Sequence, residues 1–255
     1  LLSTIKDMNY NLKIMSVKIC HLIPAAGKAT RLSGIPKFLL PIPKHKNLLS
    51  YHLDFSLLNS EIDSIKIATN SSYLPIIENL KSVGNYEKLE KIKLVNTNTM
   101  NETIHCLKTK LHDYYLLTMP DTYYSDESVI NKMISKINEN NSLDAVVGLW
   151  NIKNFQRSKI GQCQIKDGKV IKVVDKDPNA KFKYLWGAIL FKSSLWEHIN
   201  PNDPHIGYSL NPAIQNCLNI SYVKAKGTYY DCGTIEEYWR MVKEIQKWKF
   251  QKIFQ

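Results

Sequence analysis

Short apolar runs alternate with segments of helical periodicity along residues 17–150. The apolar runs are rich in β-branched and aromatic residues and therefore predict strands, at residues 17–23, 64–69, 91–95, 114–119 and 144–150. Apolar residues at three- and four-residue spacing predict helices between them, at residues 48–58, 73–81, 102–111 and 128–137. This alternation predicts an α/β fold with a mainly parallel sheet and helices on both of its faces.

The pattern changes after residue 150. Alternating residues around Asp167-Gly168 predict a hairpin over 161–174. The other elements predicted here are a strand at 184–191 and helices at 208–218 and 234–249. We therefore expect one Rossmann-like domain with a mixed, mainly parallel central sheet and a smaller β-rich subregion. Its parts are an N-terminal extension at 1–15, two halves at 16–150 and 151–233, and a C-terminal helix at 234–255.

The composition is that of an ordinary globular protein, with 44% apolar and 22% charged residues. No apolar run approaches the ~20 residues of a membrane helix, and the N-terminus lacks the features of a secretory signal. The five cysteines are scattered and lack CxxC pairing, which indicates reduced thiols. We expect a cytoplasmic protein without membrane association. Because the chain does not begin with Met, a fragment of a longer protein remains an open interpretation.

The formal net charge is +11, from 34 basic and 23 acidic residues. Such a charge favours an anionic partner through long-range attraction, either nucleic acid or a polyphosphate. The basic residues are spread along the chain without a dense arginine tract. We therefore interpret most of them as a solvated surface and expect no nucleic-acid partner.

The loop after the first predicted strand combines small residues with two cations, in the sequence PAAGKATRLSGIPK at 24–37. Small residues let the backbone approach a ligand and offer it N–H groups, here at Ala25, Ala26 and Gly27. Arg31 supplies a planar fork for phosphate oxygens, and Lys37 supplies a compact charge. Pro36 restricts the backbone just before Lys37. Together these residues predict a polyphosphate cradle.

A second loop, after the strand at 114–119, carries Asp121. Because ligands of open α/β sheets bind outside the carboxyl ends of strands, the loops after Ile23 and Met119 are expected to share one cleft. Asp121 alone would also fit a turn cap, and Asp231 a carboxylate at a helix N-terminus. Asp126 is predicted to be the N-cap of the next helix.

These loops resemble the sugar-phosphate nucleotidyltransferases. The stretch PAAGKATRLSGIPKFLLPI is similar to that family's AAGxGTR followed by PK, and the resemblance covers about residues 17–245. Three further stretches match in order: MPDTYY at 119–124, VVDKDP at 173–178 and YYDCGT at 229–234. The resemblance implies a fold of the GT-A type, with 16–150 holding the nucleotide and 151–233 the acceptor.

The resemblance also implies roles for individual residues. Mg²⁺ would be bound by Asp121 and Asp231, and the catalytic cations would be Arg31 and Lys37. The residues implied to bind nucleotide are Ala25, Ala26, Gly27, Lys28, Thr30, Thr99 and Glu102. Those implied to bind the acceptor are Asp175, Lys176, Trp186 and Gly187. For Thr99 a helix cap, and for Trp186 a core position, remain open alternatives.

The sequence departs from the family pattern at several positions. Ala29 replaces a loop glycine, and only six positions separate Arg31 from Lys37, which is nearer to uridylyl- and cytidylyltransferases than to thymidylyltransferases. Asp175 stands where the family usually has Glu, and Asp177 is inserted before Pro178. These departures leave the nucleotide and the acceptor open.

The chemistry implied is attack of a phosphate monoester on the α-phosphate of a nucleoside triphosphate, with pyrophosphate leaving. Because the attacking group is already an anion, positioning and fixed positive charge matter more than a general base. We expect a sugar 1-phosphate as acceptor; phosphocholine or a polyol phosphate, with cytidylyl transfer, is the alternative. A GT-A glycosyltransferase is a more remote one, since its donor would not need the cradle of Arg31 and Lys37. A homo-oligomer remains open.

Overall fold

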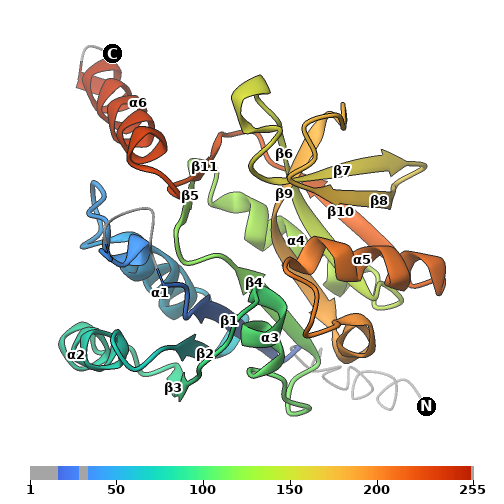
Figure 1. Cartoon of the computed structure of the whole chain (residues 1–255), viewed down its shortest axis with the longest axis horizontal. Helices are drawn as coiled ribbons and strands as arrows, with labels where there is room; N and C mark the ends of the chain where they lie inside the picture. Colours follow the sequence, from blue (N-terminus) through green and yellow to red (C-terminus); the bar gives the residue numbers. More distant parts are fainter. Residues whose placement is uncertain (1–16, 29–33, 254–255) are drawn as a thin grey trace, which may run out of the picture.

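The computed structural model describes residues 17–28 and 34–253 (Figure 1). The extension predicted at residues 1–15 therefore lies outside the described residues. Within these ranges, no helix combines the length and the apolar character that crossing a membrane requires.

A nine-stranded sheet forms the centre of the molecule, in the order β3-β2-β1-β4-β9-β6-β10-β8-β7. These strands are β1 (Ile19–Ala25), β2 (Ile62–Thr69), β3 (Leu89–Leu94), β4 (Tyr114–Thr118), β6 (Ala145–Asn151), β7 (Gly161–Lys166), β8 (Lys169–Asp175), β9 (Tyr184–Lys192) and β10 (Ile220–Lys224). Strands β3, β2, β1 and β4 pair in parallel, whereas β9 runs antiparallel to both β4 and β6. The mixed sheet that the sequence predicts is confirmed. It is not mainly parallel, because β10 also pairs in parallel with β6, but the pairings β10–β8, β7–β8 and β7–β9 are antiparallel as well, which makes four parallel and five antiparallel pairings among the described strands of this sheet.

Helices cover both faces of this sheet (Figure 1). They are α1 (Leu48–Leu58), α2 (Leu74–Gly84), α3 (Met100–His105), α4 (Ser128–Glu139), α5 (Ile206–Gln215) and α6 (Ile235–Ile253), with 3-10 helices η2 (Lys37–Leu39), η3 (Asn154–Gln156) and η4 (Ser193–His198). Alternate residues of β1 show the two faces. Ile19 and Ile23 belong to clusters shared with α1, α2 and α4, whereas Leu22 packs in the cluster with α3, α5 and η4. This alternation is what a strand buried on both faces requires.

The second half of the chain closes on itself. Strand β7 lies at the end of the sheet order and also pairs with β9, so β9, β6, β10, β8 and β7 form a ring. The hairpin joining β7 to β8 turns at Asp167 (φ 48°) and Gly168 (φ 79°), the left-handed pair that a two-residue hairpin loop favours. The predicted hairpin is therefore confirmed.

Several predicted boundaries differ from the structure. The helix predicted at 102–111 is the short α3, which ends at His105, where the Lys93 ammonium donates to the Cys106 carbonyl at 2.7 Å. Asp126 was predicted to be the N-cap of α4, but Glu127 holds that position. The Asp126 carboxylate instead accepts the N–H of Ser128 from one residue further out. Strand β10 was not predicted at all.

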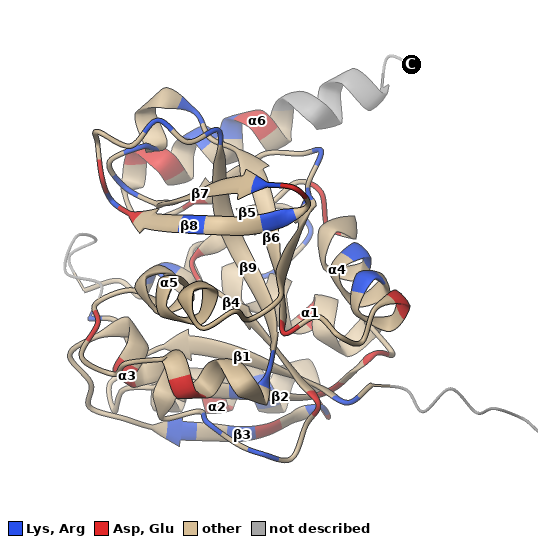
Figure 2. Cartoon of the chain, turned by 90° about the vertical axis from the view of Figure 1, so that its right-hand side faces the viewer, with Lys and Arg blue, Asp and Glu red and all other residues tan. Residues whose placement is uncertain are grey.

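Two three-residue strands form a separate ribbon beside the main sheet. Strand β5 (Thr122–Tyr124) pairs antiparallel with β11 (Tyr229–Asp231), and Thr122 lies opposite Asp231. Basic residues do not gather on one element in the view of Figure 2; they are spread over β3, β8 and α4, with acidic residues between them. This spread agrees with the solvated-surface interpretation of the net charge.

Candidate functional site

A cavity of about 420 Å³ lies at the carboxyl ends of β1 and β4. Its wall is formed by Pro24, Ala25, Ala26, Gly27, Lys28, Lys37, Phe38, Thr97, Asn98, Thr99, Met100, Thr103, Met119, Pro120 and Asp121. The loops after Ile23 and Met119 therefore share one cleft, as the order of the strands predicted. Thr30 and Arg31 fall in residues 29–33, outside the described residues.

Residues at the end of β2 form hydrogen bonds to the small-residue turn that follows β1. The Thr69 hydroxyl donates to the Ala25 carbonyl at 3.3 Å, and the Asn70 amide donates to the Ala26 carbonyl at 3.1 Å. Among the described residues, no atom lies within 4 Å of a Cβ added to Gly27, so their packing does not require a glycine there. None of these residues covers the Gly27 backbone on that side, where a ligand could approach it.

Lys37 is oriented by the residues around it. Pro36, with φ −60°, is the N-cap of η2, of which Lys37 is the first residue. The next residue, Phe38, is buried against the Tyr73 ring at a centroid distance of 5.5 Å. The Lys37 ammonium lies 3.4 Å from the Asp121 carboxylate, and both side chains remain about a quarter exposed, at 23% and 25%. A cation and a carboxylate thus face the cavity together.

The β5–β11 ribbon brings the second aspartate to the first. The N–H of Cys232 donates to the Asp121 carbonyl at 3.0 Å, directly after Asp231 in the chain. Burial of the carboxylate, together with the charges of Asp121 and Glu237, raises the pKa of Asp231 to about 7, against the opposing effects of Lys37 and the Gly233 N–H. The structure therefore concentrates like charge at this point.

Such a pair of carboxylates fits a divalent cation that also binds substrate. Mg²⁺ is commonly held by one or two carboxylates, with phosphates and water as the remaining ligands. Among the residues at 17–28 and 34–253, no cluster of three or more His, Cys, Asp or Glu side chains forms a closed metal cage. Asp121, which lines the open cavity, and Asp231 next to it suit Mg²⁺ shared with phosphates better than a structural ion.

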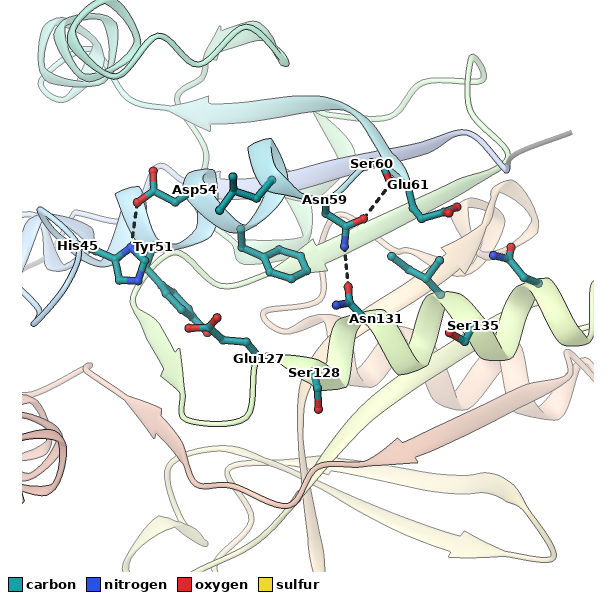
Figure 3. Close-up of a pocket in the computed structure, with 14 residues that line it drawn as sticks. His45, Tyr51, Asp54, Asn59, Ser60, Glu61, Glu127, Ser128, Asn131 and Ser135 are labelled. Carbon is teal, nitrogen blue, oxygen red and sulfur yellow. Dashed lines mark hydrogen bonds and ion pairs between the residues drawn. The ribbon is translucent and has the colours of Figure 1, made fainter. Parts of the chain in front are cut away.

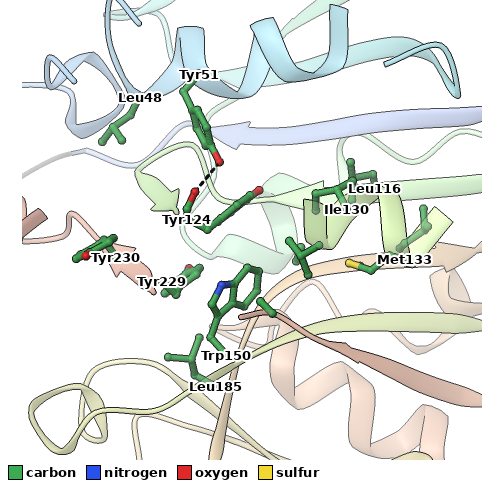
Figure 4. Packing of buried hydrophobic residues seen from close by; sticks show 14 of the residues in the cluster. Leu48, Tyr51, Leu116, Tyr124, Ile130, Met133, Trp150, Leu185, Tyr229 and Tyr230 are labelled. Carbon is green, nitrogen blue, oxygen red and sulfur yellow. Dashed lines mark hydrogen bonds between the residues drawn. The ribbon is translucent and has the colours of Figure 1, made fainter. Parts of the chain in front are cut away.

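An aromatic cluster supports the ribbon from below (Figure 4). The Tyr229 ring lies 5.3 Å from Trp150 and 6.3 Å from Tyr124, centroid to centroid. A Cβ on Gly187 would be only 2.4 Å from the Tyr229 ring and 2.7 Å from Trp150. Gly187 is therefore buried beneath β11, where its lack of a side chain allows the Asp231 strand to sit close to β9.

The region between β3 and α3 contributes to the cavity through its loop. The Thr99 hydroxyl accepts the Glu102 N–H at 2.9 Å and donates to the Pro201 carbonyl at 2.6 Å, which confirms the cap interpretation of Thr99. The Glu102 carboxylate accepts the Asn98 N–H at 2.7 Å and does not line the cavity. Thr97 and Asn98 do line it. The sequence analysis missed both because a polar residue before a helix carries no distinctive signal.

Asp175, Trp186 and Lys176 form a second group. The Trp186 indole donates to the Asp175 carboxylate at 3.2 Å. Burial raises the pKa of Asp175 despite the Trp186 hydrogen bond. Trp186 is 7% exposed, which agrees with a core position. Burial, with a smaller contribution from the Lys176 charge, lowers the pKa of His205 to about 4, so His205 also belongs to this group.

The second group lies at the same edge of the sheet as the cavity without lining it. Ala188 of β9 pairs with Thr118, the last residue of β4, and Trp186 lies two residues nearer the start of β9. A Cβ on Gly161 or Gly207 would be 2.0 or 2.1 Å from an Asp175 oxygen. These two glycines, which the sequence analysis did not select, enclose the carboxylate.

Another cavity, of about 600 Å³, lies between α1 and α4 (Figure 3). The Asn59 amide donates to Asn131 across it at 2.7 Å, and His45 pairs with Asp54 at 2.8 Å. No residue implied by the sequence to bind nucleotide, metal or acceptor lines this cavity. The candidate site is therefore the smaller cavity.

No protein-family model and no curated protein sequence matches this chain. Solved structures do. A protein assigned as a glucose-1-phosphate thymidylyltransferase from Bacillus anthracis, in complex with a sucrose, superposes with a TM-score of 0.74 and 21% identity over 87% of this chain and 93% of its own. A UDP-glucose pyrophosphorylase with UDP-glucose gives 0.73 and 21%, over 91% and 99%.

The inositol-1-phosphate CTP transferase from T. maritima gives a TM-score of 0.69 and 12% identity, over 86% of this chain and 90% of that one. The fold is that of the sugar-phosphate nucleotidyltransferases. The fold resemblance read from the loop sequences is therefore confirmed. In this nucleotidyltransferase fold, the cavity with Lys37 and Asp121 lies at the carboxyl ends of the parallel strands, where open α/β sheets bind ligands.

Proposed function

We propose that this chain is a nucleotidyltransferase that transfers a nucleotidyl group from a nucleoside triphosphate to a sugar 1-phosphate. The observation that carries this proposal is that Lys37 and Asp121 line one cavity as an ion pair, while the Cys232 N–H bond to the Asp121 carbonyl brings the neighbouring Asp231 close to Asp121. The fold shared with two pyrophosphorylase-type structures supports it. A glycosyltransferase would not require the Lys37 cation beside the small-residue turn.

Each residue has a role in this proposal. Asp121 and Asp231 hold Mg²⁺, which neutralises phosphate charge on both substrates when it is bound. Lys37 binds phosphate oxygens of the triphosphate, and the backbone of the turn at 25–28 provides further donors. Arg31 completes the cradle, and Lys176 binds the phosphate of the acceptor. Positioned positive charge is the main requirement of phosphoryl and nucleotidyl transfer.

In this proposal the two halves of the chain bind different substrates. We assign residues 16–150 to the nucleotide, because they supply the turn, Lys37 and Asp121. Residues 151–233 are assigned to the acceptor, because Asp175, Lys176 and Trp186 gather there. The single-domain, GT-A type description belongs to the same proposal, and so does a cytoplasmic location.

The direct test is pyrophosphate release. The purified chain is incubated with Mg²⁺, each of the four NTPs or dTTP, and a panel of sugar 1-phosphates, phosphocholine and polyol phosphates. We expect one nucleotide and one acceptor to give pyrophosphate, with release abolished by EDTA. Absence of pyrophosphate for every combination would contradict the proposal. UDP-sugar hydrolysis without pyrophosphate formation would favour a glycosyltransferase instead.

A second candidate is cytidylyl transfer to a polyol phosphate. It is supported by the similarity to an inositol-1-phosphate CTP transferase and by the short spacing from Arg31 to Lys37. The same panel separates the two candidates, since this one predicts turnover with CTP and a polyol phosphate and none with UTP and glucose 1-phosphate.

A further inference from the structure

Four buried side chains form a continuous hydrogen-bonded chain beneath the Asp121 loop. Ser56 Oγ lies 2.5 Å from His21 Nδ1, and His21 Nε2 lies 2.7 Å from Thr118 Oγ1. Thr118 Oγ1 lies 3.2 Å from His52 Nδ1, and His52 Nε2 lies 3.0 Å from the Thr122 carbonyl oxygen. Each of the four side chains is at most 2% exposed. The chain thus connects α1, β1 and β4 to the first residue of β5.

The Thr122 carbonyl, at one end of the hydrogen-bonded chain, fixes the direction of every hydrogen bond in it as long as both histidine rings are neutral. A carbonyl oxygen only accepts, so His52 Nε2 carries the hydrogen, and in a neutral ring Nδ1 is then an acceptor. Thr118 must therefore donate to His52 and accept from His21 Nε2–H. His21 Nδ1 becomes an acceptor in turn, and Ser56 donates to it. Ser56, Thr118 and both histidines have one arrangement that satisfies all four hydrogen bonds.

Both histidines are neutral in this arrangement, and their surroundings favour that state. Burial, together with the His52 ring, lowers the pKa of His21 well below its ordinary value. Burial also lowers the pKa of His52 to about 4, against the effect of the Thr122 carbonyl. A second proton on His21 would require the Ser56 hydroxyl to turn from donor to acceptor. The hydrogen bonds therefore favour neutral rings at His21 and His52, and neutral rings in turn preserve these hydrogen bonds.

The hydrogen-bonded chain of side chains ends at Thr122, next to the proposed metal ligand Asp121. His52 holds the carbonyl of Thr122, and Cys232 N–H holds the carbonyl of Asp121 at 3.0 Å. Tyr51, the neighbour of His52 on α1, donates to the Tyr124 carbonyl at 3.1 Å (Figure 4). The carbonyls of Asp121, Thr122 and Tyr124 are thus held from two sides, by α1 and by the residue after β11. The backbone that carries the carboxylate has little freedom to move.

We propose that Ser56, His21, Thr118 and His52 form a one-directional hydrogen-bond chain that positions Asp121 against Asp231. These four are positioning residues that act through the Thr122 carbonyl and touch no substrate. The inference rests on the proposed function in one respect only, namely that Asp121 binds the metal ion of the reaction.

The first test needs no activity. Two-bond ¹H–¹⁵N correlation spectra of the ¹⁵N-histidine-labelled protein at pH 7 report the tautomer of each ring. We expect both His21 and His52 to be neutral, with the hydrogen on Nε2. Either of two results at His52 would overturn the proposal. In an Nδ1–H tautomer, Nε2 has no hydrogen to donate to the Thr122 carbonyl. In an imidazolium, Nδ1 is not able to accept from Thr118.

The second test removes the central hydroxyl. Thr118→Val keeps the side-chain shape, and Thr118→Ser keeps the hydroxyl. In Thr118→Val we expect His21 to change to the Nδ1–H tautomer, since Ser56 is able to accept as well as donate, whereas His52 stays Nε2–H. A merely structural role for Thr118 would not produce this asymmetry. An unchanged His21 tautomer in Thr118→Val would contradict the directional chain.

The same variants test positioning directly. Mn²⁺ affinity, measured by electron paramagnetic resonance without nucleotide, is expected to fall about tenfold in Thr118→Val, as is kcat, since a buried unsatisfied partner is costly. Thr118→Ser should lie within about twofold of the wild type. The control is Ser221→Ala, which removes another buried hydroxyl bond, to Gly168 on the β7–β8 hairpin, and should change neither quantity.

The outcomes separate this inference from the proposed function. If the wild type releases no pyrophosphate but Thr118→Val weakens Mn²⁺ binding and changes the His21 tautomer, the positioning chain stands and the proposed reaction fails. If the wild type is active and Thr118→Val binds Mn²⁺ normally with normal kcat, the reaction stands and the positioning role is overturned.

Discussion

At the scale of single residues, Lys37 and Asp121 are 84 positions apart in the chain, yet their charged atoms lie 3.4 Å apart. Lys37 is placed by Pro36 and by the burial of Phe38, and Asp121 by the hydrogen bonds on either side of it. Neither side chain is deeply buried, so both are able to exchange their mutual contact for contacts with phosphate and metal. This partial exposure is what distinguishes them from a structural ion pair.

Lys37→Ala is expected to lower turnover at least about a hundredfold, because it removes a fixed charge from the site proposed for nucleotidyl transfer. The variant should stay folded, since the lysine side chain is partly exposed. Steady-state pyrophosphate release gives the rate. Lys108→Ala, which removes a surface ion pair with Glu197, serves as the control and should leave the rate unchanged. Near-normal turnover in Lys37→Ala would remove it from the mechanism.

Asp231→Asn is expected to raise stability while it abolishes activity. The substitution removes a buried charge that Asp121 and Glu237 repel, and active sites commonly store such unfavourable charge. In EDTA at pH 8 we expect the melting temperature to rise on the order of 5 °C. Asp126→Asn, at a carboxylate that accepts hydrogen bonds from Ser128 and Lys226, should instead lower it. If Asp231→Asn is less stable than the wild type in EDTA, the charge of Asp231 does not destabilise the metal-free protein, and the prediction is wrong.

At the scale of elements, the decisive feature is the β5–β11 ribbon, whose strands have three residues each. Three residues are too few for a periodic pattern, so the sequence analysis gave no sign of this pairing. The motif resemblance implied that Asp121 and Asp231 bind one Mg²⁺ together, and the register that places Thr122 opposite Asp231 gives the backbone pairing between their two loops. The helix cap at Thr99 was foreseeable, because Thr before a helix is a common N-cap.

Gly187→Ala tests the support of that ribbon. The new methyl group would meet the Tyr229 and Trp150 rings, and we expect a loss of about 2 kcal/mol in unfolding free energy from overpacking. Urea unfolding measures the loss. Gly148→Ala, in the adjacent strand β6, is the matched control. Its nearest neighbour is the flexible Met133 sulfur at 3.1 Å, so its loss should be smaller. Equal losses would contradict the close-packing role of Gly187.

His52, a buried residue of α1, is expected to make the stability of the protein depend on pH. The folded pKa of His52 is lowered to about 4 from its ordinary 6.5, so unfolding takes up a proton between these values. The contribution of His52 is therefore present above pH 6.5 and is lost as the pH falls toward 4. Urea unfolding at pH 7 and pH 5 measures the change. His52→Gln, which does not titrate, should lose less stability over this window than the wild type.

At the scale of the whole molecule, nine strands share one sheet, and the second half closes back on β9. This arrangement places β9 between β4 and β6, so that the residues around Trp186, proposed to bind the acceptor, and the cavity beside Met119 lie at one edge. A net charge of +11 favours the approach of any polyanion by long-range attraction. Discrimination between anions therefore has to come from the shape and the polar groups of the cavity.

Binding of the correct nucleotide should stabilise the whole fold. With Mg²⁺ and the accepted NTP at about a hundred times Kd, linkage predicts about 2.7 kcal/mol of added stability, which corresponds to several degrees in a thermal shift assay. The other nucleotides should give smaller shifts. Asp121→Asn should lose the Mg²⁺-dependent part of the shift. Equal shifts with duplex DNA, disappearing steeply with salt, would point to a nucleic-acid binder instead.

The sequence by itself determined the class of fold and the chemistry of the loops. Strand and helix periodicity is local, and so are the small residues after the first strand and the cation that follows Pro36. Such features follow from backbone geometry and hydrophobic patterning over a few residues. The sequence also indicated the small-residue turn and Lys37, which line one cavity in the structure.

Only the tertiary structure decided which residues meet. The register between β5 and β11, the enclosure of Asp175 by two glycines, and the hydrogen bonds from Ser56 to His52 all join segments far apart in the sequence. Their geometry depends on strand register and on packing between layers, which no local pattern encodes. That is why local patterns predicted loops that line the candidate cavity and gave no sign of the contacts that support them.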